Sequence, residues 1–320
     1  MKTTQRLIAS LREEGVLSRA ALRVGQGDRV LGEVYVGADS RTLFDMASVT
    51  KILVTTPLAL MAADEGKLAL DDPVGRFFPV PAHNRALTVR HLLTHTTGVG
   101  HRDLTAPGIT QGTVAAHILA LRGGPIGERV DYSCPAFILL GKLLEQVCAR
   151  PLDALFAERI AAPLGMTHSR FCPEGAVVDD YNCRHLGGVA GNAGLFSCVE
   201  DVAAFVHCLL RGGAPLMAPA TLDEACRNQT AGKGEARGLG FLYVDEHYPQ
   251  TGDLFPVGSV GHCGHTGTSV FLDRPSGLYA VLLTDATRTL QKTLGREDYG
   301  AVKDMRRRIH NAIRSDLMKE

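Results

Sequence analysis

Apolar residues near the N-terminus are spaced first as in a helix and then as in strands. Residues 3–14 place their apolar side chains on one face of a predicted amphipathic helix. Two strand-like runs, 20–24 and 30–36, follow it and are separated by the turn-forming sequence Gly-Gln-Gly-Asp at 25–28. This order predicts a helix followed by a β-hairpin.

The most strongly apolar helical segment begins at Ser48 and continues to about Gly66. It is apolar on almost every side, so we expect a helix that is buried rather than amphipathic. Pro57 lies inside this segment. Because proline lacks a backbone N–H, a kink or a break is predicted there.

From there to about residue 230 the apolar spacing is mostly helical, with Gly- and Pro-rich connections. The sequence Ser-Cys-Val-Glu at 197–200 is typical of a capping box and predicts the start of one of these helices. After residue 236 the pattern changes to the strand-like runs GLGFLYV, TSVFLD and GLYAVLLTD. A closing helix is predicted over 297–317.

These elements predict an α/β (α+β) fold in which one antiparallel sheet is flanked by helices. Residues 1–60 and 236–320 are expected to form the sheet part, because both contain helices and strands. Residues 61–235 are expected to form a mainly helical insertion. We expect the functional site in the cleft between these two parts.

The charge of the chain is balanced, with 34 Lys and Arg residues against 34 Asp and Glu residues. Nucleic acids and anionic membrane surfaces attract a surplus of positive charge, so neither partner is expected. The apolar run 52–61 is too short to span a bilayer, and charged residues interrupt the first 14 positions, unlike a signal peptide. We therefore expect a cytoplasmic protein whose eight cysteines are free thiols.

Ser48 and Lys51 form an SxxK element at the start of the apolar segment. Residues three apart lie on one face of a helix, so the amine of Lys51 can reach the hydroxyl of Ser48. A serine hydroxyl is a poor nucleophile until a neighbouring base takes its proton, and a lysine can serve if burial disfavours its charged form. Ser48 can equally be a simple helix N-cap, so this element alone does not define a function.

Two further stretches add polar groups that suit the same chemistry. Tyr132 lies in DYSC, just before the helical PAFILLGKLLEQV, where its phenol can reach into a cleft and transfer protons. The sequence GHCGHTG at 261–267 leads into TSVFLD, and its glycines permit close approach of the backbone to a ligand. A strand edge can also present an N–H group to a developing oxyanion.

Serine, tyrosine and histidine elements in this order resemble those of the serine β-lactamase and penicillin-binding-protein superfamily. Within it, the chain is similar to the branch that contains class C β-lactamases, DD-peptidases, D-aminopeptidases and related esterases. The resemblance implies a β-lactamase/transpeptidase-like fold. The segments that carry it run in family order from about residue 20 to residue 285, and they are FDMASVTK, ADEGKLALDDPVGRFFP, LTVRHLLTHTTGV, YSCPAFILLG, GGVAGNAGLFSCVEDVAAF and GLYAVLLTD.

The resemblance implies a role for each residue that matches a family motif. Ser48 would be the nucleophile that becomes acylated, and its backbone N–H would be one of two oxyanion donors. Lys51 would activate Ser48, and Tyr132 would share the general acid–base work.

The third element is similar to the family's Lys/His-Thr-Gly sequence and can be read in two registers. We prefer the register that begins at His262, because the longer stretch before TSVFLD resembles the family's Gly-rich run. Gly264 would then line the substrate site, and the backbone N–H of His265 would be the second oxyanion donor. The rival register begins at His265 itself.

Two cysteines depart from the family pattern. Cys134 stands where family members usually have asparagine, and Cys263 stands where they usually have threonine. Asparagine offers an amide donor and acceptor, and a thiol is weak at both, so these substrate-site positions should recognise β-lactams poorly. The two thiols could instead join His262 and His265 around a metal, but nothing else in the chain supports this. We expect no metal and no organic cofactor.

We therefore expect a serine hydrolase that cleaves an ester or an amide, with a β-lactam as a further possibility, through an acyl-enzyme on Ser48. Its partner would be a small-molecule substrate, and the sequence leaves the oligomeric state open. One alternative is a true β-lactamase or a peptidase or amidase acting on D-amino-acid compounds. Another is a catalytically weakened binding or scaffold protein on the same fold, which the two cysteines would favour.

Overall fold

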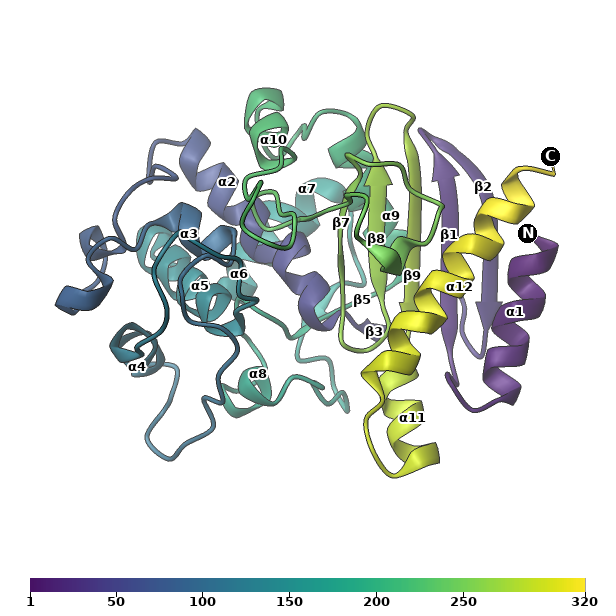
Figure 1. Ribbon diagram of the computed structural model, residues 1–320, viewed down its shortest axis with the longest axis horizontal. Coiled ribbons are helices and arrows are strands. Elements are labelled where there is room, and N and C mark those ends of the chain that lie inside the picture. Colours follow the sequence, from purple (N-terminus) through teal and green to yellow (C-terminus); the bar gives the residue numbers. More distant parts are fainter. Residues whose placement is uncertain (320) are drawn as a thin grey trace.

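The computed structural model describes residues 1–319 (Figure 1). The α-helices are α1 (Lys2–Glu13), α2 (Thr56–Asp64), α3 (Val89–Leu93), α4 (Val114–Ala120), α5 (Cys134–Cys148), α6 (Leu152–Phe156), α7 (Ala162–Leu164), α8 (Tyr181–His185), α9 (Val199–Leu210), α10 (Pro219–Ala225), α11 (Ala286–Leu294) and α12 (Tyr299–Leu317). The strands are β1 (Ala20–Gln26), β2 (Arg29–Val36), β3 (Phe44–Asp45), β4 (Arg170–Phe171), β5 (Leu195–Ser197), β6 (Leu242–Tyr243), β7 (Val260–Cys263), β8 (Ser269–Asp273) and β9 (Leu278–Thr284). Short 3₁₀ turns are η1 (Ala47–Val49), η3 (Val74–Arg76), η4 (Ala82–Asn84) and η6 (Pro249–Thr251), and π-helical turns are η2 (Lys51–Thr55) and η5 (Ala157–Ala161).

A six-stranded antiparallel sheet, in the order β2-β1-β9-β8-β7-β6, unites the two ends of the chain (Figure 1). The predicted hairpin of β1 and β2 is confirmed, and so are the late strands β8 and β9. The expected strand GLGFLYV is extended only at β6, because Gly240 adopts a φ of 78° and the chain turns there. A second, three-stranded sheet has the order β3-β5-β4.

The two faces of the large sheet are buried against different helices. Successive side chains of a strand point to opposite faces. Ala20, Leu22 and Val24 of β1 therefore pack in the apolar cluster that includes α1 and α12, whereas Ala21 packs in the cluster that includes α9. In Figure 1, α1 and α12 lie side by side over one face, and they are in contact. The helices predicted at the two ends of the chain are thus confirmed.

The apolar segment that follows Ser48 is buried as expected, but it is not a regular α-helix from its start. It passes through η1 and η2 before α2 begins at Thr56. Pro57 lies in the first turn of α2, directly after η2, and because it lacks an N–H it cannot continue the hydrogen-bond pattern of that turn. The predicted break therefore takes the form of a change from π-helix to α-helix.

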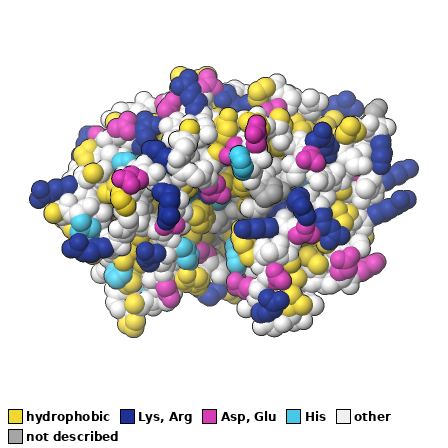
Figure 2. All heavy atoms as spheres, viewed as in Figure 1, with side chains coloured by type: hydrophobic (Ala, Val, Ile, Leu, Met, Phe, Trp, Pro, Cys, Tyr) yellow, Lys and Arg dark blue, Asp and Glu magenta, His cyan; other side chains and the backbone are white. Residues whose placement is uncertain are grey.

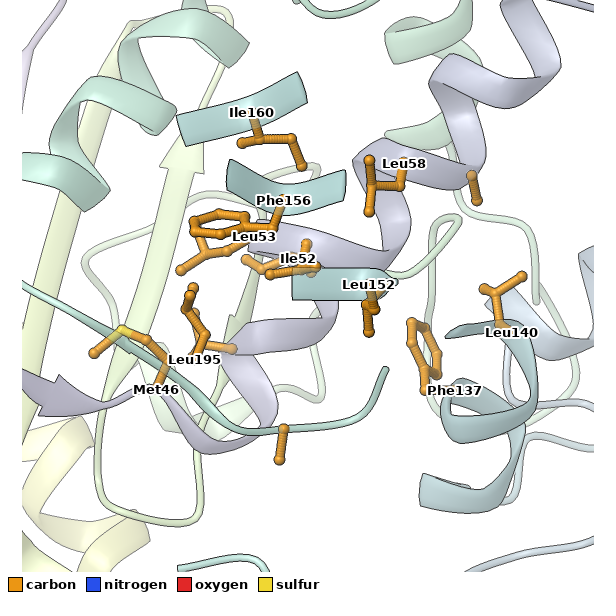
Figure 3. Packing of buried hydrophobic residues seen from close by; sticks show 14 of the residues in the cluster. Met46, Ile52, Leu53, Leu58, Phe137, Leu140, Leu152, Phe156, Ile160 and Leu195 are labelled. Atoms are coloured by element: carbon orange, nitrogen blue, oxygen red, sulfur yellow. The ribbon is translucent and has the colours of Figure 1, made fainter. Parts of the chain in front are cut away.

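Apolar packing fixes this segment in place. Figure 3 shows Ile52 and Leu53 near Phe156 of α6 and Leu195 of β5, all members of one buried cluster. Such close packing leaves little freedom for the backbone that carries Ser48.

The capping box predicted at 197–200 is wrong. The helix α9 begins after Cys198, whose side chain makes no capping hydrogen bond. Ser197 is the last residue of β5, and its hydroxyl lies 2.7 Å from Ser169 Oγ. Glu200 accepts a hydrogen bond from Ser40 Oγ at 2.6 Å instead of reaching back to the helix start. Strand pairing therefore places the serine one residue before the cap position.

Within residues 1–319, no helix combines the length and the apolar character needed to cross a membrane. Figure 2 shows Lys and Arg side chains interspersed with Asp and Glu over the face that it draws. The eight cysteines are free, as the sequence predicts.

Candidate active site

Ser48 follows a residue that is held in an unfavourable conformation. Ala47 has a φ of 44°, in the left-handed region that costs a non-glycine residue about 1–3 kcal/mol. Its N–H donates to Asp45 Oδ1 at 2.7 Å, and the other oxygen of Asp45 accepts from the N–H of Asp179, also at 2.7 Å. Burial raises the pKa of this Asp45 carboxyl to about 7. Asp45 thus ties down the turn that presents Ser48.

Lys51 is fully buried, and its amine has three polar neighbours. Nζ lies 3.0 Å from Ser48 Oγ, 2.9 Å from the backbone oxygen of Asn192 and 3.8 Å from Cys134 Sγ. Burial lowers the pKa of the amine. A neutral amine has two N–H groups and one lone pair. If the N–H groups point to Asn192 and Cys134, the lone pair faces the Ser48 hydroxyl.

Tyr132 approaches Ser48 from the loop before α5. Its Oη lies 2.7 Å from Ser48 Oγ and can donate a hydrogen bond to it. The ring of His95 lies against the Tyr132 ring with centroids 4.6 Å apart, and His95 Nδ1 accepts the N–H of Ser133 at 3.0 Å. Enclosure of Tyr132 raises the pKa of its phenol well above the usual value. Tyr132 therefore favours its protonated form near neutral pH.

The two histidines of the third element occupy different environments. His262 lies in β7, with its ring centroid 6.2 Å from that of Tyr132. Its Nδ1–H donates to the Cys263 oxygen at 2.8 Å, and burial lowers the pKa of the ring well below its usual value. His265 lies in the turn after β7, and its ring stacks on Tyr299. The first register thus places its histidine beside Tyr132, and the rival register places its histidine against Tyr299 of α12.

The turn that follows β7 contacts the turn that carries Ser48. A Cβ atom added to Gly264 would lie 2.8 Å from the backbone oxygen of Met46, so only glycine fits this approach. From α12, the buried Arg306 donates hydrogen bonds to the backbone oxygens of Gly264 and Gly267. A helix at the end of the chain thus holds the third element against the nucleophile turn.

A cavity of about 540 Å³ opens at Ser48. Lys51 and Gly264 are not part of its lining. Its lining includes the other predicted site residues, namely Ser48, Tyr132, Cys134, His262, Cys263 and His265. The structure therefore brings together all of these groups, although they come from stretches far apart in the chain.

Sequence reasoning missed three residues that surround the tyrosine and the lysine. His95 supports the ring of Tyr132, and Asn192 binds Lys51 through its backbone oxygen. Arg237 lines the cavity, and its Cζ lies 5.3 Å from the centroid of the Tyr132 ring. His95 and Asn192 lie in the family-like segments LTVRHLLTHTTGV and GGVAGNAGLFSCVEDVAAF, but sequence reasoning gave neither of them a role in the chemistry. Arg237 directly precedes the predicted strand GLGFLYV, which was the only available signal.

The four residues considered as metal ligands do not gather as a metal site requires. Within residues 1–319, the side chains that bring three possible ligand atoms within 4.8 Å of one another are His168, Cys198 and Asp201. One oxygen of that aspartate is already bound by the N–H groups of His168 and Ser169, at 2.9 and 2.7 Å. These hydrogen bonds join the residues just before β4 to the first turn of α9 and account for the position of Asp201.

A serine hydroxyl in contact with a buried amine and a phenol, beside a cavity, is the arrangement typical of serine hydrolases that have SxxK and tyrosine elements. Comparison with known proteins agrees with this class. The sequence model of the Beta-lactamase family matches residues 4–303, and the chain belongs to that family.

Known relatives include enzymes that are named for different activities. Esterase EstB of Burkholderia gladioli is 29% identical over 307 residues, which cover 76% of this chain and 77% of EstB. The D-alanyl-D-alanine-carboxypeptidase/endopeptidase AmpH of Escherichia coli K12 is 26% identical over 271 residues, which cover 73% of this chain and 70% of AmpH. The family acts on small ester or amide substrates, and the chain is a hydrolase of this family.

Solved structures agree on the fold. EstCE1, described as a hydrolase with promiscuous acyltransferase activity, superposes with a TM-score of 0.78 at 22% identity and covers 98% of this chain and 97% of its own. The predicted family, the α/β fold class and the hydrolase class are therefore confirmed.

Proposed function

We propose that the chain hydrolyses small esters or amides through an acyl-enzyme on Ser48. The observation that carries the proposal is the position of Ser48 Oγ, which lies 3.0 Å from Lys51 Nζ and 2.7 Å from Tyr132 Oη. The cleft between the sheet part (1–60 and 236–320) and the helical part (61–235) would hold the substrate.

Acylation would move two protons. Lys51 takes the Ser48 proton while Oγ attacks the carbonyl carbon, because burial favours the free amine. The N–H groups of Ser48 and His265 would stabilise the oxyanion of the tetrahedral intermediate. Tyr132 then gives its proton to the departing alcohol or amine and regains one from the lysine ammonium, which leaves an ester on Ser48.

Deacylation would use the same groups in reverse. A water molecule takes the place of the leaving group and gives one proton to the Lys51–Tyr132 pair as its oxygen attacks the acyl carbon. Collapse of the second intermediate returns a proton to Ser48 Oγ and releases the carboxylic acid. The enzyme ends each cycle in its starting protonation state.

Esters are favoured over β-lactams by the two cysteines. The Cys134 thiol lies 3.8 Å from Lys51 Nζ, and Cys263 Sγ lies 3.3 Å from the hydroxyl of Tyr248. Neither thiol replaces the donor and acceptor that an asparagine amide would offer to a β-lactam amide. The 29% identity with an enzyme named an esterase supports the same choice.

Steady-state rates on p-nitrophenyl butyrate and on the β-lactam nitrocefin test this proposal. We expect the wild type to cleave the ester with a kcat/KM at least about tenfold above that for nitrocefin, and Ser48→Ala to lose both activities. Faster turnover of nitrocefin would support a true β-lactamase instead. Ester cleavage that survives in Ser48→Ala would contradict the acyl-enzyme, and a wild type without any hydrolysis would support the scaffold alternative.

A further inference from the structure

Arg237 is buried beside the proposed machinery with its hydrogen-bonding capacity only partly used. Its side chain is 3% exposed, and both Nε and Nη2 donate to one oxygen of Glu235, Nε at 2.8 Å. Its Nη1 is buried and has no hydrogen-bond partner within residues 1–319. A buried, partly unsatisfied guanidinium is costly to the fold, so a functional reason for this position is worth testing.

The guanidinium lies over the phenol that contacts Ser48. Arg237 Cζ is 5.3 Å from the centroid of the Tyr132 ring, and Lys51 Nζ is 5.1 Å from the same centroid. The guanidinium and the amine thus lie near the same ring, and the charge of Arg237 acts on both Lys51 and Tyr132. A guanidinium keeps its proton in proteins, whereas a buried lysine amine can lose one.

The titratable groups around Tyr132 carry little other charge. His95 and His262 are neutral because burial lowers the pKa of each ring well below its usual value. Cys134 stays a thiol because burial raises its pKa. The titratable or charged groups that face Tyr132 from the elements around it are Lys51 of η2, His95, Cys134 of α5, Arg237, His262 of β7 and Tyr299 of α12. Among these described groups, Arg237 is the fixed positive charge. Lys51 also faces the Asp180 carboxylate, which lines the same cavity and whose negative charge opposes that of Arg237.

We propose that Arg237 is a positioning residue that acts through its charge, by holding Lys51 as a free amine and by stabilising the phenolate that Tyr132 leaves when it protonates the leaving group. This assignment rests on the proposed function, because it concerns the same two proton carriers. Burial is the largest cause of the lowered pKa of Lys51. Cys134 and Asp180 oppose it, and the charge of Arg237 acts in the same direction as burial. The same charge opposes the rise that burial causes in the pKa of Tyr132.

Glu235 sets how strongly this charge is felt. Its carboxylate pairs with Arg237 but is 41% exposed, so water screens part of its opposing field. Removal of the carboxylate should strengthen the effect of Arg237, and removal of the guanidinium should abolish it. The two substitutions therefore have opposite predicted signs, which damage to the fold would not produce.

The test compares Arg237→Gln, Glu235→Gln and Arg237→Lys with the matched control Arg274→Gln, which removes an ion pair to Asp223 outside the cavity lining. The Lys51 protonation state is followed by ¹³C NMR of its Cε, assigned by its absence in Lys51→Met. The pH dependence of kcat/KM on p-nitrophenyl butyrate gives a second readout.

We expect Arg237→Gln to move the Lys51 titration and the acid limb of the rate profile upward by about one pH unit. At a fixed pH below that limb, kcat/KM of the variant should be about tenfold lower than that of the wild type. Glu235→Gln should move both downward, and Arg237→Lys and Arg274→Gln should leave them near the wild-type position. Shifts of Arg237→Gln and Glu235→Gln in the same direction, or no shift of the Lys51 titration, would overturn the assignment. The NMR titration needs no turnover, so it decides this point even if the proposed hydrolysis fails.

Discussion

Replacement of Lys51 by methionine separates catalysis from stability more cleanly than any other change at this site. Methionine has nearly the length of lysine but no amine, and position 51 is fully buried. The substitution removes the group 3.0 Å from Ser48 Oγ that is proposed to take its proton. General bases contribute about 10²–10⁴-fold to rate, so we expect kcat/KM on an ester to fall by about 10³-fold or more.

The stability of Lys51→Met should change far less than its activity. Each unit by which burial lowers the pKa of the amine costs the folded state about 1.4 kcal/mol, and methionine removes this cost. Against this gain, the backbone oxygen of Asn192 loses its donor at 2.9 Å, a loss of about 1–3 kcal/mol. The two contributions have opposite signs, so they partly cancel in the unfolding free energy at pH 7.

The pH dependence of stability gives the sign of the effect. The unfolded lysine titrates near pH 10.4, above the folded one, so the unfolded state binds more protons between the two pKa values. Stability of the wild type therefore rises as pH increases toward 10, and Lys51→Met lacks this contribution. Urea unfolding of both proteins at pH 7 and pH 9.5 measures it. A wild type that gains no stability over the variant between these pH values would refute the lowered pKa of the Lys51 amine. A variant that keeps its activity would refute the role of Lys51 as the base.

Two further substitutions examine the groups around Ser48. Tyr132→Phe removes the hydroxyl that lies 2.7 Å from Ser48 Oγ but keeps the ring beside His95. We expect kcat/KM on an ester to fall by about 10²–10⁴-fold and the unfolding free energy to change by about 1 kcal/mol. A loss of activity below tenfold would exclude the role of Tyr132 as the acid. The pKa of Asp45 in the folded state, about 7, lies above the unfolded value near 3.9. The folded state therefore binds more protons between these values, and wild-type stability should fall by up to about 4 kcal/mol between pH 4 and pH 7. Asp45→Asn should lack this fall in urea unfolding at pH 4 and pH 7.5, and equal changes in both proteins would contradict the assignment.

The residues close together in sequence were the ones that local reasoning could place. The spacing of Ser48 and Lys51 brings their side chains to one face even though η1 and η2 replace a regular α-helix there. The order of Tyr132 and His262 along the chain was informative only through the family resemblance. Their convergence depends on the pairing of β7 within the sheet and on the loop before α5, which local spacing does not reveal.

The groups that sequence reasoning missed act over long separations in the chain. Arg237 reaches Tyr132 from the loop before β6, and Arg306 reaches the turn after β7 from α12. Neither arginine follows a motif, because its partners are an aromatic face and backbone oxygens that carry no sequence signature. The wrong prediction of a capping box at Ser197 has a similar cause, since pairing of Ser197 with Phe44 of β3 decided where α9 begins.

The most direct test of the account is the intact mass of the protein after treatment with a fluorophosphonate ester, followed by peptide mapping. We predict one added phosphonyl group on the peptide that contains Ser48, and no addition in Ser48→Ala. A label on Cys134, Cys263 or another serine, or a label that persists in Ser48→Ala, would contradict the claim that Ser48 is the nucleophile.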